Sequence, residues 1–223
     1  MDIIIQKTQT FVQETLKNAE KGHDYDHVER VWKYSLKIAQ LEEQKNTQQK
    51  INFLVLQLAA LLHDIADYKF HAGNEDIGPQ TASDFLKNTG LVDQGTIDQV
   101  THIIINISFK GAQVQNTMKS LEGLIVQDAD RLDALGAVGI ARCFAYGGFK
   151  NRALYDPQIQ PVLHNSSDAY KKNQSPSLNH FYEKLFHLKD QMNTQSGKEL
   201  AEKRHDFMVE FVNRFKQEWE GNQ

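Results

Sequence analysis

Apolar residues recur every three or four positions along most of the chain, a spacing that keeps one face of an α-helix apolar. In the first half of the sequence this pattern predicts five helices, at residues 4–16, 28–39, 51–66, 76–88 and 97–107. Asp24 or Asp26 is the expected N-cap of the second helix, because an aspartate side chain can accept the free amides of the first turn. Residues 103–109 are rich in β-branched side chains, but no second strand is available to pair with them. We therefore expect that segment to be helical.

The second half of the sequence predicts one long helix and two that follow it. Ser120 is the expected cap of a helix that continues through Ala145, and its apolar residues cover most of its circumference, so we place it centrally. Two further helices are predicted at residues 178–188 and 200–219, with a turn at 193–197 between them.

Residues 147–176 show no sustained periodicity and hold three of the four prolines. A structureless segment of this length in a compact domain is usually functional or mobile, so we expect either a lid that closes over a substrate or a plain connector. The predicted organisation is all-α, with a helical core at residues 1–146, the long loop at 147–176, and C-terminal helices at 177–223 packed on the core.

Composition and charge narrow the class of protein. Of the 223 residues, 40% are hydrophobic and 24% are charged, which is typical of a soluble globular protein. The net charge of −4 gives no general attraction to nucleic acid or to an anionic membrane, so we expect neither as a partner. The single cysteine, Cys143, excludes an intramolecular disulfide and fits a reducing compartment. With no export signal and no apolar run of the roughly 20 residues that span a bilayer, the sequence predicts a cytoplasmic protein.

Four side chains carry the candidate chemistry. His27 lies in HDYDHVERV, His63 and Asp64 follow the apolar run LAALL, and Asp130 lies in IVQDADRLDALG inside the predicted long helix. A charged aspartate in an apolar helix is costly unless it is paired or bound to a cation, and the His-Asp doublet poses the same problem. One divalent ion held by two imidazoles and two carboxylates would solve both.

The donor set also limits the ion and its chemistry. Mixed nitrogen and oxygen ligands suit Mn, Fe, Co, Ni or Zn, whereas an all-oxygen set would point to Mg or Ca. Our candidates for the single ion are Mn, Ni, Co, Fe and Mg. Four protein ligands on an octahedral ion leave two positions for water and a substrate oxygen. Because such an ion lowers the pKa of bound water and neutralises a phosphoryl oxygen, the set predicts metal-assisted hydrolysis.

The runs HDYDHVERVW, AALLHDIAD and VQDADRLDALGAVGIAR together resemble the HD-domain superfamily of metal-dependent phosphohydrolases, especially a group of small bacterial HD hydrolases. The likeness covers most of the chain, including GKELAEKRHDFM near its end. In that superfamily the first His, the His-Asp doublet and the last Asp bind the metal, which implies that His27, His63, Asp64 and Asp130 are ligands. The resemblance further implies a single HD-type helical domain that hydrolyses a phosphoester or phosphoanhydride bond. The favoured substrate is a nucleotide, for example in a nucleoside triphosphate pyrophosphohydrolase.

Asp128 competes with Asp130 as the last ligand. Helical phase does not choose between them, because the helix is apolar on most sides. The resemblance favours Asp130, since the ligand of related sequences lies in an Ala-Asp-Arg-Leu context. Some HD proteins use extra histidines to bind two metals, but the spacing of His71 and His102 does not match that pattern, so we expect one metal.

Two further residues are candidate catalytic groups. Asp67 lies four residues after His63, on the same face if the helix continues, and related hydrolases often carry an acidic residue there. It would orient the attacking water or act as a general base. His23 lies four residues before His27 and would transfer a proton to the leaving group.

A phosphorylated substrate also requires cationic side chains. Arg131 lies beside the ligand candidate Asp130, but it is equally a candidate structural partner of Asp128 or Asp133. Most Lys and Arg side chains of a protein are simply solvated, which applies to each member of this group. The candidate substrate-binding residues are Lys110, Arg131, Arg142, Lys184 and Arg204.

Two other functions remain open on the same scaffold. An HD-fold di-iron oxygenase would need more histidines in the site than the sequence assigns, and a non-catalytic nucleotide-sensing module would be expected to lose the His-Asp doublet. A P-loop enzyme is excluded by the lack of a GxxxxGK loop. A homodimer is expected only as the commonest assembly for a protein of this size.

Overall fold

The computed structural model describes residues 2–19, 24–48, 50–66, 76–107, 117–163 and 175–222. These residues form α-helices and one 3-10 helix and contain no β-strand, which confirms the predicted all-α fold. They divide into two compact units, with the boundary inside α6 (Leu121–Asp133): the first unit ends at Asp130 and the second continues from Arg131. The predicted division at residues 146 and 176 stays a prediction.

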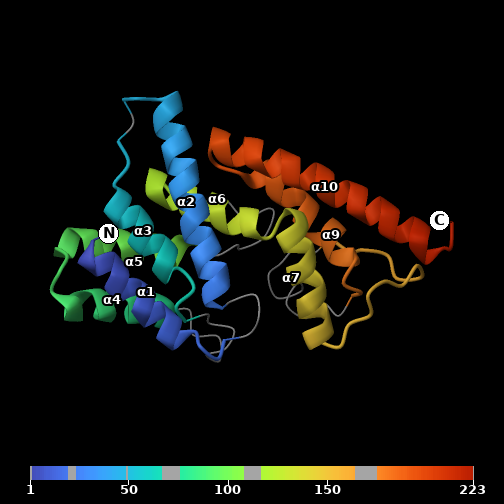
Figure 1. Cartoon of the computed structure of the whole chain (residues 1–223), viewed down its shortest axis with the longest axis horizontal. Helices are drawn as coiled ribbons and strands as arrows, with labels where there is room; N and C mark the ends of the chain where they lie inside the picture. Colours follow the sequence, from blue (N-terminus) through green and yellow to red (C-terminus); the bar gives the residue numbers. More distant parts are fainter. Residues whose placement is uncertain are drawn as a thin grey trace. The chain divides into compact units, whose positions relative to one another are not determined.

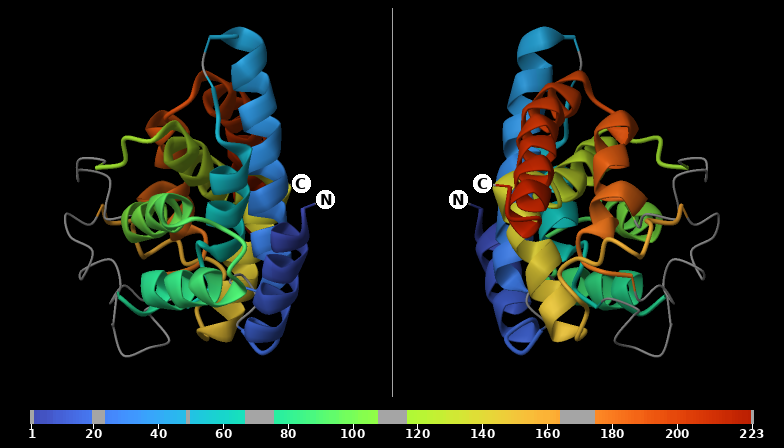
Figure 2. Two further views of the ribbon diagram at one scale, coloured as in Figure 1. Left: turned by 90° about the vertical axis from the view of Figure 1, so that its left-hand side faces the viewer. Right: turned by 90° about the vertical axis from the view of Figure 1, so that its right-hand side faces the viewer.

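The first unit is built around α3 (Phe53–Leu62), which is buried from Val55 through most of its length. It contacts α1 (Ile3–Thr15), α2 (Tyr25–Lys45) and α5 (Gln94–Ile107). Figure 2 shows α2 and α3 lying side by side, and Figure 1 shows α4 (Ile77–Thr89) beside α5. The predicted apolar faces of α1, α2 and α5 are the buried ones: Ile4, Thr8, Val12, Val28, Val31, Ser35, Ile38, Ala39, Ile97, Val100, Ile103, Ile104 and Ile107.

The ends of these helices follow from side-chain and glycine caps. Asp24 caps α2 by accepting the amide of His27 at 3.2 Å, which decides between the two predicted caps. α4 ends at Gly90, whose φ of +62° is readily adopted by glycine. No helix of the described residues is long and apolar enough to cross a membrane.

α3 is shorter than the predicted helix at residues 51–66. It ends at Leu62, and residues 63–66 form a turn. The side chain of His63 explains the end, because its Nδ1 lies 2.8 Å from the carbonyl oxygen of Ala60. In a continuing helix that carbonyl would accept the amide of Asp64, so the imidazole competes with the next backbone hydrogen bond.

The single long helix predicted from Ser120 through Ala145 is wrong. α6 ends at Asp133, and α7 (Gly136–Phe149) begins after a break of two residues. Between the two helices Leu135 is extended, and Gly136, the first residue of α7, has a φ of +73°. A side chain at Gly136 would be strained at that φ, and its Cβ would lie 3.1 Å from Cγ of Arg204. The apolar spacing continues across this break, which is why periodicity alone did not reveal it. Ser120 does cap α6, since its Oγ accepts the amide of Gly123 at 3.2 Å.

The second unit also corrects the predicted C-terminal helices. The helix expected at residues 178–188 is divided into α9 (Asn179–Glu183) and the 3-10 helix η2 (Leu185–Gln191), because Lys184 leaves helical geometry at φ −145°. α10 (Gln195–Trp219) begins inside the predicted turn, where Thr194 accepts the amide of Gly197 at 3.0 Å. It contacts α7 and η2 (Figure 1).

Aromatic rings pack against one another in this second unit, around the buried Phe181. Phe144 of α7 lies with its ring centre 6.1 Å from Phe181, 6.0 Å from Phe211 and 5.8 Å from Phe215. α7 continues to Phe149, beyond Ala145 and into the predicted loop. The described part of the predicted long loop, residues 150–163, contains no helix, and the remainder up to residue 174 lies outside the described residues.

Candidate metal centre

His27 lies in the first turn of α2, with its side chain only 2% exposed. The backbone amide of His27 is the one that the capping carboxylate of Asp24 accepts. The cap therefore fixes the backbone from which the imidazole projects. A histidine buried so deeply must meet polar groups on its ring nitrogens, since burying them without a hydrogen bond or a cation is costly.

His63 and Asp64 occupy the turn that ends α3. Because Nδ1 of His63 lies 2.8 Å from the carbonyl oxygen of Ala60, the neutral ring donates its Nδ1 proton there. The lone pair of that ring is then on Nε2, which is the atom that faces His27. The turn that ends α3 thus places both side chains beside His27 of α2.

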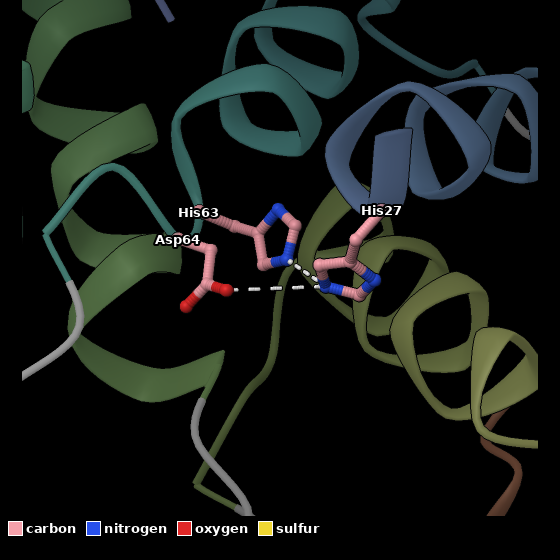
Figure 3. A group of neighbouring side chains, drawn as sticks. All are labelled: His27, His63 and Asp64. Carbon is pink, nitrogen blue, oxygen red and sulfur yellow. Dashed lines mark hydrogen bonds and ion pairs between the residues drawn. The ribbon is translucent and has the colours of Figure 1, made fainter. Parts of the chain in front are cut away.

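Side chains from three helices converge at this point. Nε2 of His63 lies 3.3 Å from Nε2 of His27, and Oδ2 of Asp64 lies 4.0 Å from the same nitrogen (Figure 3). Donor atoms of His27, His63 and Asp64 all lie within 4.8 Å of one another. Oδ1 of Asp130, on α6, lies 3.5 Å from Nε2 of His27. All four predicted ligands therefore come together around the His27 imidazole, in the first unit.

The donor atoms suit a divalent transition-metal ion. Two imidazole nitrogens face each other, and two carboxylates from Asp64 and Asp130 adjoin them. A cation between these atoms would relieve the repulsion of facing lone pairs and would be balanced by two negative charges. Mixed imidazole and carboxylate donors are typical of sites for such ions.

Exposure rises from one side of this cluster to the other. The side chain of His27 is 2% exposed, that of Asp64 is 16% and that of Asp130 is 41%. The His27 imidazole is thus the most deeply buried of these three side chains, and the Asp130 carboxylate is the most exposed to solvent. A ligand can reach the cluster from the Asp130 side.

The structure also distinguishes the two candidate aspartates of α6. Asp128 is completely buried, whereas Asp130 is the one beside His27. Sequence phase had left this choice open, and the geometry favours Asp130. Asp128 has interactions of its own.

Three of the other predicted site residues lie outside the described residues. These are the catalytic candidates His23 and Asp67 and the substrate-binding candidate Lys110, so their predicted roles stay predictions. His71 also lies outside the described residues, and His102 is exposed on α5.

The predicted substrate-binding arginines make defined contacts within the second unit. Nη1 of Arg131 donates to the carbonyl oxygen of Gln191 at 2.6 Å, and Arg204 donates to the carbonyl of Leu132 near the end of α6. Both acceptors are backbone carbonyl groups near the end of a helix, where no further backbone amide of that helix is available to donate to them.

A third arginine pairs with an acid. Nη1 of Arg142 lies 2.6 Å from Oδ2 of Asp133, whose side chain is completely buried. The sequence had offered Asp133 as a partner of Arg131 instead. Lys184 lies between α9 and η2. Substrate binding by these four residues stays a prediction.

Sequence reasoning did not single out His180, a half-buried histidine of α9. The pKa of His180 is lowered to about 3, chiefly by burial and to a lesser extent by the nearby charges of Lys184 and Arg152. Burial also raises the pKa of the Cys143 thiol to about 12, which disfavours the reactive thiolate. No spacing or motif in the sequence marks His180, because its burial depends on how α9 packs.

Comparison with known proteins places these features in context. The chain matches the HD domain family over residues 24–135, a span that contains Asp24 and all four convergent side chains. A solved HD-superfamily hydrolase from Bacillus thuringiensis is 43% identical, with 97% of each chain covered and a TM-score of 0.73. YpgQ from Bacillus subtilis is 36% identical over 97% of this chain and 94% of its own. The crystal structure of YpgQ in complex with ADP superimposes with a TM-score of 0.72 and 32% identity, covering 96% of this chain and 97% of YpgQ.

Proposed function

The chain belongs to the HD-domain family of metal-dependent phosphohydrolases, and on that premise we propose that it hydrolyses a phosphoanhydride or phosphoester bond of a nucleotide. A nucleoside triphosphate that is split to release pyrophosphate is the favoured case. The observation that carries the proposal is the cluster of His27, His63 and Asp64, whose donor atoms all lie within 4.8 Å of one another, with Oδ1 of Asp130 3.5 Å from Nε2 of His27. The ADP complex of the YpgQ relative supports a nucleotide as the ligand class.

Each of these side chains has a distinct part in the proposed site. His27 and His63 would hold a divalent ion through Nε2, and Asp64 and Asp130 would supply the negative charge that balances it. The contact of His63 Nδ1 with the Ala60 carbonyl fixes which nitrogen of that ring is available. When bound, the ion would polarise a phosphoryl oxygen and lower the pKa of a water molecule.

Access to the site agrees with a polyanionic substrate. A phosphate would approach from the side of the partly exposed Asp130, because the His27 side chain is buried. The Asp130 carboxylate would repel that phosphate if its charge were not balanced by a cation. The site should therefore bind nucleotide weakly without metal and tightly with it.

The test is an assay of purified protein against nucleoside and deoxynucleoside mono-, di- and triphosphates, with Mn, Mg, Co or Ni added. Products are resolved as phosphate or pyrophosphate, which identifies the bond that is cut. The His63→Ala/Asp64→Ala variant should lose metal-dependent turnover. His102→Ala is the matched control, because it removes an exposed histidine outside the cluster and should leave turnover unchanged.

Two outcomes would contradict the proposal. Turnover that persists in the double variant would remove the site from the reaction. Metal-loaded protein that turns over none of these compounds would exclude nucleotide hydrolysis. Tight nucleotide binding in that second case would indicate a sensing module, and two irons per chain would indicate an oxygenase.

A further inference from the structure

α6 carries Asp130, one of the four candidate ligands. The burial of α6 does not by itself define how the helix is rotated about its own axis. Residues 125–129 are all completely or almost completely buried. Successive residues of a helix are separated by about 100° around the axis, so five in a row cover the whole circumference. Over these five residues, burial alone therefore favours no particular rotation of the helix. Some other interaction must decide which aspartate faces His27.

A buried polar contact provides that selection. Nε2 of Gln127 donates to the backbone carbonyl of Asn106 at 3.0 Å, and Gln127 is only 4% exposed. Asn106 lies in the last turn of α5, where carbonyl groups lack an in-helix donor. The contact therefore supplies a donor to a carbonyl that needs one, and it joins α6 to α5 at one rotation.

A second contact joins α6 to α3. Oε1 of Glu122 accepts the backbone amide of Asn52 at 2.8 Å, and Asn52 is also the residue whose side chain caps α3. This contact is exposed, so we expect it to contribute less than the Gln127 contact. Both contacts lie within the first unit.

The positions of these two residues around the helix place Asp130 between them. With Glu122 set at zero, ideal helix geometry puts Asp130 at about 80°, Gln127 at about 140° and Asp128 at about 240°. Asp130 is thus flanked by the two contacts, whereas Asp128 lies on the opposite side of the axis. A rotation that brought Asp128 toward His27 would break both contacts and leave the Gln127 amide buried without its acceptor.

We propose that Gln127, assisted by Glu122, is a positioning residue that sets the rotation of α6 and so selects Asp130 over Asp128 as the fourth metal ligand. The inference rests on the proposed metal site but not on the substrate. A buried donor left unsatisfied is costly, so the Gln127 contact excludes the alternative rotation, which burial alone would allow.

The experiment measures the affinity of the purified full-length protein for Mn²⁺ alone, by titration calorimetry. Gln127→Met keeps the length and burial of the side chain but removes the donor. We expect it to weaken Mn²⁺ binding by about 10–100-fold, the range typical of residues that orient metal ligands. Val126→Ala is the matched control, because it removes buried volume from the same turn of α6 without touching the contact. It should lower thermal stability and leave the affinity unchanged.

A double-mutant cycle separates positioning from a general structural role. If Gln127 acts through Asp130, then Gln127→Met should have little further effect in an Asp130→Ala background. Equal losses in both backgrounds would overturn the inference, as would an unchanged affinity in Gln127→Met alone. Both of these results would leave the proposed function standing. Wild-type protein that bound no Mn²⁺ would refute the metal site itself.

A second pair of variants covers the case in which Gln127→Met does not fold. Glu122→Ala removes the other contact at an exposed position, and Glu122→Gln keeps an acceptor oxygen at the same length. We expect a several-fold loss of Mn²⁺ affinity in Glu122→Ala and wild-type affinity in Glu122→Gln. Equal affinities in these two variants would overturn the inference.

Discussion

Nε2 of His27 lies 3.5 Å from Oδ1 of Asp130, which joins the first turn of α2 to the last turn of α6. The His63 imidazole and the Asp64 carboxylate adjoin the same nitrogen from the end of α3. The fully buried imidazole thus has a donor atom from each of two other helices beside it. This relationship makes Asp130, and not its neighbour Asp128, part of the candidate metal centre.

Removing a residue that only orients a metal ligand typically weakens metal affinity by about 10–100-fold. Asp130→Ala removes a candidate ligand itself, so we expect it to weaken Mn²⁺ affinity by at least as much. Asp128→Asn is the matched comparison two residues away. It should leave Mn²⁺ affinity unchanged and lower the free energy of unfolding by about 1–3 kcal/mol, because Asp128 is completely buried. Calorimetric Mn²⁺ titration and urea denaturation measure the two effects. The reverse pattern, with Mn²⁺ affinity lost in Asp128→Asn and kept in Asp130→Ala, would show that Asp128 is the ligand and that the assignment of Asp130 is wrong.

Asp24→Ala should lower the free energy of unfolding by about 1 kcal/mol, because it removes the side chain that caps α2. Asp24→Ser keeps a capping oxygen and should retain most of the stability. Urea denaturation followed by circular dichroism measures both variants. If Ala and Ser gave the same midpoint, the contact with the His27 amide would not contribute to stability.

Arg142→Met should destabilise the protein by about 3–5 kcal/mol, because it leaves the buried carboxylate of Asp133 without its guanidinium partner. The control is Arg214→Met, which removes an arginine that is 71% exposed and paired with Glu218 one turn away. That pair should contribute only about 0.3–0.5 kcal/mol. Similar losses in the two variants would contradict a structural role for Arg142.

His180 should make the protein less stable as the pH falls below about 6.5. Its pKa is lowered from 6.5 to about 3 in the folded protein, chiefly by burial, so between these values the unfolded chain binds a proton that the folded chain does not. Stability therefore rises with pH in that window and is lost as pH decreases through it, by at most about 1.4 kcal/mol per pH unit.

The measurement compares wild type with His180→Gln by urea denaturation at several values between pH 7.5 and pH 5. The variant lacks this ionisation, so its stability should decrease less steeply than that of wild type. The difference between the two proteins isolates His180 from the histidines of the metal centre. Parallel curves for the two proteins would show that His180 is accessible to protons in the folded state.

Local spacing predicted the helices of the first unit because helix formation depends on residues three or four positions apart. The same spacing missed the break before Gly136, since the apolar residues on either side keep their period while one backbone angle changes sign. It also missed the end of α3 at Leu62, because that end depends on a hydrogen bond from the side chain of His63.

The histidine and aspartate side chains of the candidate site could be recognised from sequence. The resemblance of their motifs to those of HD-domain proteins assigned His27, His63, Asp64 and Asp130 as candidate ligands. The cationic residues could not be assigned in the same way. Arg131 and Arg204 donate to backbone carbonyls that lie far from them along the chain, and no local pattern encodes such contacts.

The sequence by itself determined the all-α fold and the family, and it named the candidate metal ligands, because periodicity and residue type are properties of the chain. Only the tertiary structure decided that Asp130 rather than Asp128 adjoins His27, because residues 125–129 of α6 are all buried and the rotation of the helix depends on contacts with other helices. Burial and the distances between helices arise only when distant segments pack together, so they also decided the lowered pKa of His180 and the pairing of Arg142 with Asp133.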